Sequence, residues 1–148
     1  MFAKGFDKYA CHGDSITCTV DGFDVTARIY HDDHADAPAE MSDGFWPSLD
    51  PKSAGYIGHR SKGTLARHMA KARAVMDAWK NDEWFYCGIV LTVHKAGIPV
   101  VEKYHVALWG IECNYPGSDN SYLTEVANDL LGEALDLAKA NVSKLCAA

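Results

Sequence analysis

The sequence contains no apolar run long enough to cross a bilayer, and its first residues lack the apolar stretch of a secretory signal peptide. Its five cysteines are an odd number without paired close spacing, so we expect free thiols rather than structural disulfides. These absences predict a cytoplasmic protein with no membrane partner. At 148 residues the chain is long enough to bury a core, and a single domain spanning residues 1–148 is the simplest organisation.

Catalytic signatures are scarce as well. The chain lacks the Gly-Lys-Ser/Thr order of a Walker A loop, the Gly-x-Gly-x-x-Gly of dinucleotide folds and the Gly-x-Ser-x-Gly of many hydrolases. Glu112, beside Cys113 and Asn114, is a lone acid at the end of a predicted strand. A single carboxylate is too little evidence for a hydrolase active site. A non-enzymatic protein without an organic cofactor is therefore favoured.

The net charge of −6 is unevenly spread along the chain. Residues 31–50 hold six acidic residues and no Lys or Arg, whereas residues 59–80 hold six basic residues and one acid. Residues 81–148 are acidic again. We therefore expect an acidic loop, a basic helix and an acidic helix, which differs from the uniform charge of a dedicated DNA mimic or DNA binder.

The periodicity of the apolar residues predicts four strands and two helices. Residues 15–20 and 23–30 alternate around Asp21-Gly22, a dipeptide suited to a type I′ hairpin turn. Two apolar strands, 84–94 and 98–111, follow a helix at 61–80, and a last helix spans 121–144. The order β-β-α-β-β-α predicts an α+β two-layer sandwich, an antiparallel sheet with two helices packed on one face.

Three segments of the predicted fold lead to further structural expectations. Residues 31–60 have no period and should form a long structured loop between the first hairpin and the first helix. Glu102-Lys103 should be a bulge or a second turn. Trp109, between Leu108 and Ile111, should be buried, and Trp109→Ala should then cost roughly 3–5 kcal/mol.

The segment His31-Asp32-Asp33-His34-Ala35-Asp36 gathers two imidazoles and three carboxylates at a strand end. Such groups suit zinc, manganese or iron, so a divalent-metal site is one interpretation. Adjacent residues of an extended segment point to opposite sides, however, and a solvated acidic loop is the favoured alternative. The metal set would be His31, Asp33, His34 and Asp36.

A glycine-rich basic segment, 55–63, leads into the first helix, where free backbone N–H groups and the helix dipole favour anions. An ordinary loop is the favoured interpretation, and phosphate binding is the alternative. Together with the following helix it offers a basic surface for direct nucleic-acid binding. That surface comprises Arg60, Lys62, Arg67, Lys71 and Arg73.

Two acidic surfaces are predicted in addition to this basic surface. The first, in the loop, comprises Asp32, Asp33, Asp36, Glu40 and Asp43. The second is a stripe on the last helix, opposite its apolar face, and comprises Glu125, Asp129, Glu133 and Asp136. A solvated surface is the simplest interpretation of this stripe. The alternative is a docking surface for a basic partner, including the helix face at Arg67 and Lys71 of a second copy in a homodimer.

Two segments carry a resemblance. DAWKNDEWFY at 77–86 and LWGIECNYPGSDN at 108–120 resemble small proteins encoded by bacteriophages and other mobile elements of bacteria. The resemblance covers mainly residues 77–134, and no catalytic residue carries over from it. It implies a viral or plasmid accessory protein of the bacterial cytosol, a group that includes inhibitors of host defence such as anti-CRISPR proteins.

Three functional hypotheses follow. The first is a binding protein that inhibits a host protein or protein–nucleic-acid complex, most concretely an anti-CRISPR inhibitor whose acids occupy a basic site meant for nucleic acid. The second is a metal-dependent hydrolase or nuclease using the cluster at 31–36. The third is a nucleic-acid-binding protein using the basic helix.

Overall fold

The computed structural model describes residues 1–41 and 43–147, and its contacts divide the chain into two compact units. The first unit comprises Met1–Asp33 and Phe85–Ala148, and the second comprises His34–Trp84. That the chain forms one domain stays a prediction, and each unit is described by itself.

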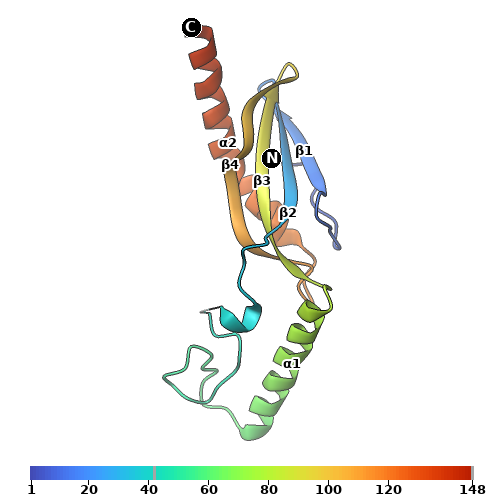
Figure 1. Cartoon of the computed structure of the whole chain (residues 1–148), viewed down its shortest axis with the longest axis vertical. Coiled ribbons are helices and arrows are strands. Elements are labelled where there is room, and N and C mark those ends of the chain that lie inside the picture. Colours follow the sequence, from blue (N-terminus) through green and yellow to red (C-terminus); the bar gives the residue numbers. More distant parts are fainter. Residues whose placement is uncertain (42, 148) are drawn as a thin grey trace. The chain divides into compact units, whose positions relative to one another are not determined.

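A four-stranded antiparallel sheet organises the first unit (Figure 1). Its spatial order is β1-β2-β3-β4, so every strand pairs with its neighbour in sequence. The bounds are β1 Ser15–Val20, β2 Phe23–His31, β3 Phe85–Lys95 and β4 Ile98–Cys113. The α+β class and the predicted order β-β-α-β-β-α are confirmed.

The first hairpin forms as predicted because its turn residues accept the required backbone. Asp21 and Gly22 both have positive φ, at 52° and 76°, as a type I′ turn demands. The pairs Val20↔Phe23 and Cys18↔Val25 then place the alternating apolar residues of both strands on one face. On β2 that face is buried, and the polar residues between are exposed or half-buried.

Helix α2, Ser121–Ala147, covers one face of the sheet (Figure 1). Its wide apolar stripe explains the packing, because positions three and four apart share one side of a helix. The stripe residues Leu123, Ala127 and Ala134 are almost fully buried and join Ile89, Leu91 and Val93 of β3 in one core. None of the helices that the structure describes has the length and apolarity needed to cross a membrane.

The edge strand β4 is irregular, and this overturns the predicted burial of Trp109. Ile89 pairs with Leu108 and Cys87 with Ile111, so one residue is extra on β4, and Gly110 there has a φ of 74°. The bulge interrupts the alternation, and Trp109 is 40% exposed. Its indole lies directly on Gly88, where an added Cβ would fall within 2.3 Å of the ring. The predicted irregularity near Glu102-Lys103 is present, with Tyr104 at a φ of 75°.

The stacking of Trp109 on Gly88 gives a testable coupling. Because the indole is partly exposed, Trp109→Ala should now cost about 1–2 kcal/mol, below the sequence-based expectation. Gly88→Ala should cost about 1–3 kcal/mol by overpacking against the ring. In the Trp109→Ala background, Gly88→Ala should instead be neutral or stabilising, since alanine is preferred over glycine in a strand.

Urea unfolding of the four proteins in this double-mutant cycle measures the coupling. Gly132→Ala is the matched control, because a Cβ at that position in α2 meets nothing within 4 Å. It should stabilise the protein by about 0.5–1 kcal/mol in both backgrounds. Purely additive effects of Gly88→Ala and Trp109→Ala would contradict the stacked geometry.

The second unit contains a 3₁₀ turn, η1 Pro38–Glu40, and the helix α1, Lys62–Lys80. Ser61 caps α1, its Oγ accepting a hydrogen bond from the Thr64 N–H at 3.2 Å. The loop before the helix is folded on itself. Ser48 pairs with Tyr56, and the Gly55 backbone lies so close to the Trp46 carbonyl that no side chain fits there. The helix face at Ala72, Val75 and Met76 is buried.

Candidate binding surfaces

The net charge of the protein belongs to the first unit. Its segments Met1–Asp33 and Phe85–Ala148 contain 13 acidic and 7 basic residues, whereas the second unit contains 7 of each. The formal charge of −6 therefore falls on the sheet unit, and the second unit is neutral overall. This separation gives the first unit the net negative electrostatic potential of the protein.

The acidic stripe predicted on the last helix is exposed. Its four carboxylates project from α2 on the side away from the core, and none forms an ion pair among the residues that the structure describes. Three of them repeat every four residues, which aligns like charges at a mutual cost of a few tenths of a kcal/mol per pair. The stripe comprises Glu125, Asp129, Glu133 and Asp136.

The acidic loop divides between the two units. Asp32 and Asp33 end the first unit, and Asp36, Glu40 and Asp43 lie exposed in the second. Asp32 has a structural role, since its Oδ2 accepts a hydrogen bond from the Gly110 N–H at 3.1 Å and so holds the β4 bulge. The Asp32 carboxylate thus connects the residue that follows β2 to the edge strand β4.

The proposed metal ligands are not assembled as a site. His31 Nδ1 lies 2.9 Å from Asp33 Oδ1, and its ring stacks on Phe85 at 5.1 Å between ring centroids. His34 and Asp36 belong to the other unit. Within residues 1–41 and 43–147, no three His, Cys, Asp or Glu side chains lie close enough together to hold a metal ion. The metal-site hypothesis at 31–36 thus has no cluster of described side chains to support it.

The basic residues are all exposed, as the third hypothesis requires, but part of the expected anion site is already used. The Thr64 N–H donates to the Ser61 side chain, and Arg60 Nε donates to the Ile57 carbonyl at 2.9 Å. Arg67 donates to Thr64 Oγ1 at 3.4 Å. Lys62, Lys71 and Arg73 complete this surface.

The buried thiol of Cys87 is unsuited to nucleophilic catalysis. Cys87 and Cys113 are fully buried in the core. The hydrogen bond with Cys113, and then burial, raise the pKa of the Cys87 thiol well above its usual range. A protonated, inaccessible sulfur does not attack a substrate.

The sheet face opposite α2 carries an aromatic cluster that the sequence pattern did not predict. Tyr30, Tyr104 and Trp109 follow one another with ring centroids 6.2 and 6.0 Å apart. The Lys103 ammonium lies 4.0 Å from the Tyr30 ring and 4.7 Å from the Tyr104 ring. In both contacts the ammonium lies over an aromatic ring, the arrangement of a cation–π interaction. The signal for it was the break in alternation at 102–104.

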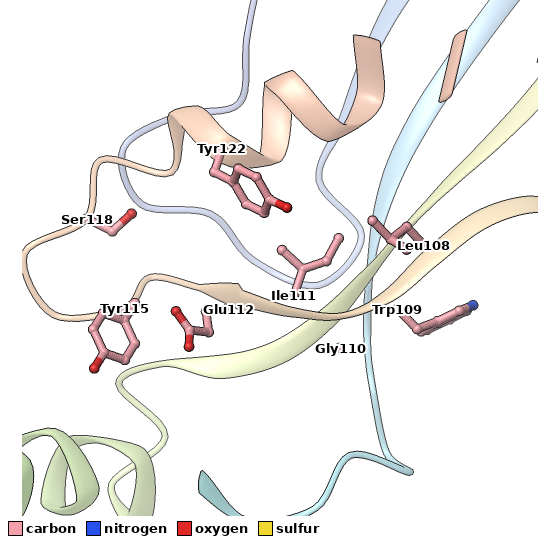
Figure 2. Close-up of a pocket in the computed structure, with 8 residues that line it drawn as sticks. All are labelled: Leu108, Trp109, Gly110, Ile111, Glu112, Tyr115, Ser118 and Tyr122. Carbon is pink, nitrogen blue, oxygen red and sulfur yellow. The ribbon is translucent and has the colours of Figure 1, made fainter. Parts of the chain in front are cut away.

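A pocket of about 370 Å³ lies where the Gly110 bulge meets the turn into α2. Figure 2 shows Ile111, Leu108 and Tyr122 on the helix side of β4, with the Glu112 carboxylate and the Tyr115 ring on its other side. Trp109, Gly110 and Ser118 complete the lining. The pocket therefore wraps the outer edge of the sheet and combines one carboxylate with three aromatic rings.

Comparison of the chain with protein-family models, with curated proteins and with solved structures finds no match, so its function has to be inferred from its own side chains and their geometry.

Proposed function

We propose that this protein is a non-catalytic binding protein that recognises a basic surface on a macromolecular partner. The observation that carries the proposal is the concentration of the whole net charge of −6 in the sheet unit, with the four-acid stripe exposed on α2. A one-signed surface attracts an oppositely charged partner and raises the rate of encounter.

The anti-defence inhibitor is the concrete form of this proposal. Its support is the resemblance of 77–86 and 108–120 to proteins of phages and mobile elements, together with the acidic surface. A protein of this kind would act in a bacterial cytosol and would occupy a basic nucleic-acid site on a host protein. Direct nucleic-acid binding is less favoured, because the sheet unit would repel phosphate and the second unit is neutral overall.

Neutralising the α2 stripe tests the proposal. The variant carries Glu125→Gln, Asp129→Asn, Glu133→Gln and Asp136→Asn. Capture of bacterial proteins from a lysate should fall about tenfold at low salt, and the remaining capture should depend less on salt. Stability should be equal or slightly higher, because the repulsion between i and i+4 carboxylates is relieved.

The matched control removes four exposed acids from the second unit, by Asp36→Asn, Glu40→Gln, Asp43→Asn and Asp77→Asn. It has the same net charge as the stripe variant and should bind as the original does. Equal capture by all three proteins across salt concentrations would refute the proposal. Loss of capture in the control alone would place recognition on the acidic loop. Sedimentation of the purified proteins shows whether a second copy is the partner.

A further inference from the structure

Strand β1 forms the second edge of the sheet, and the outer side of its main chain is open. Among the described residues, β1 pairs with β2 alone, in a register without interruption. The two-residue turn makes Val20 and Phe23 a hydrogen-bonded pair, and such pairs alternate with unbonded ones along an antiparallel ladder. The main-chain groups that point away from β2, and that accept or donate no hydrogen bond within the described part of the chain, are therefore those of Ser15, Thr17 and Thr19.

This open edge lacks the features that keep other sheet edges from pairing. Natural edge strands are protected by charged side chains, proline or bulges. The opposite edge, β4, has an interrupted register, Pro99 and the charged residues Glu102 and Lys103. Strand β1 has the sequence Ser-Ile-Thr-Cys-Thr-Val, without a charge, a proline or a bulge. Strand β1 is thus free to accept a further strand.

We propose that the outer edge of β1 pairs antiparallel with β1 of a second copy of the chain, with the two-fold axis at Thr17. Thr17 then faces Thr17 of the second copy, Ser15 faces Thr19, and Ile16 faces Cys18. In this register the outward N–H groups of each strand meet the outward C=O groups of the other. The two four-stranded sheets join into one continuous antiparallel sheet.

The side chains of β1 fit an identical strand. Hydroxyl and apolar residues alternate symmetrically on either side of Thr17, so hydroxyl groups face hydroxyl groups on one side of the joined sheet. Thr–Thr and Thr–Ser pairs of this kind stabilise antiparallel strands. On the other side, Cys18 is only half-buried and gains cover from Ile16 of the second copy. A basic partner fits less well, because β1 itself offers no carboxylate to a cationic segment.

The acidic charge of the sheet unit opposes this pairing only weakly. Helix α2 packs mainly on β3 and β4, away from the β1 edge (Figure 1). At a strand spacing of about 4.8 Å, the two copies of α2 would be roughly 25 Å apart across the joined sheet. That separation exceeds the Debye length, which is about 10 Å at 0.1 M salt, so repulsion between the two acidic stripes is largely screened.

Sedimentation of the full-length protein tests the proposal, with a reductant present because Cys11 and Cys146 are exposed thiols. Six residues per copy form a contact at the small end of specific interfaces, so we expect a dissociation constant of about 10–100 μM. Hydrogen exchange of the Thr17 and Thr19 amides should slow at least about tenfold between dilute and concentrated protein. A monomer at every concentration, or exchange of these amides that does not depend on concentration, would overturn the proposal.

A charge exchange at the axis tests the register. Thr17→Lys and Thr17→Glu each place two like charges opposite one another, so each variant alone should dimerise at least about tenfold more weakly. An equal mixture of the two should dimerise again, since opposite charges then face each other. Thr26→Lys is the matched control, because Thr26 pairs with Thr17 on β2 and with Thr92 on β3 and so has no open side. It should dimerise as the original does.

Unchanged dimerisation of both Thr17 variants, or no recovery in their mixture, would contradict pairing at Thr17. Circular dichroism of each variant shows that the fold is kept. This inference goes beyond the proposed function, and the two fail separately. The variant without the α2 stripe should still dimerise, because its β1 is unchanged. Dimerisation through β1 with no bacterial partner captured would reject only the proposed function, and capture by a monomeric protein would reject only the pairing of β1.

Discussion

Replacing Trp84 by alanine should lower the free energy of unfolding by roughly 3–5 kcal/mol, the cost of deleting a buried aromatic side chain. Trp84 is 1% exposed and is the largest fully buried side chain described in the protein. Its indole Nε1 donates to the Val75 carbonyl of α1 at 2.9 Å, so the residue anchors the end of the second unit to its helix. Urea unfolding followed by circular dichroism measures the loss.

Two variants separate packing from hydrogen bonding. Trp84→Phe keeps a ring and loses the indole N–H, so it should cost about 1–2 kcal/mol. Trp46→Ala makes the same change as Trp84→Ala at a residue that is 36% exposed, and it should cost about 1 kcal/mol. A cost below about 1 kcal/mol for Trp84→Ala would mean that its burial does not stabilise the fold.

Asn120→Ala should cost roughly 3 kcal/mol or more, although it removes only a small side chain. Asn120 is the one buried polar or charged residue among those described, at 1% exposure. Its Oδ1 accepts from the Asn114 N–H at 2.9 Å, and its Nδ2 donates to the Lys8 carbonyl at 3.0 Å and to Asn114 Oδ1 at 2.7 Å. Its removal would leave buried partners unsatisfied, each at about 1–3 kcal/mol.

The backbone adds to this cost, because Asn120 has a φ of 63°, which asparagine tolerates better than alanine. Asn141→Ala is the control, since Asn141 Nδ2 donates a hydrogen bond of 2.7 Å to the Val100 carbonyl and the residue is only partly buried. It should cost about 1 kcal/mol. Near-equal costs for the two alanine variants would show that the Asn120 hydrogen bonds do not act together.

Asn120 and its neighbours Asn114 and Thr124 hold the N-terminal segment, which the sequence did not reveal. Asn114 Oδ1 accepts from the Ala10 N–H at 2.9 Å, and Thr124 Oγ1 accepts from the Phe6 N–H at 3.0 Å. These bonds join positions more than one hundred residues apart. Asparagine and threonine at a turn or at the start of a helix are usually interpreted as capping residues. The sequence pattern therefore did not predict their hydrogen bonds to the distant N-terminal segment.

The sequence by itself determined the elements whose cause is local. Alternation around Asp21-Gly22 specified the first hairpin, and the helical period specified α1 and α2 within a few residues. The exposure of the α2 stripe followed from the same period, because a helix that buries one side must turn the other to water. Each of these inferences needs only neighbours within a few residues.

The tertiary structure alone decided the features of the candidate pocket. A one-residue bulge in β4, opposite β3, places Trp109 on the sheet face away from α2. The Asp32 carboxylate, just after β2, stabilises that bulge. The Lys103 and Tyr104 positions arose from a second irregularity of the same strand. Strand register depends on pairing energies summed over both strands, and one extra residue reverses the direction of every side chain beyond it.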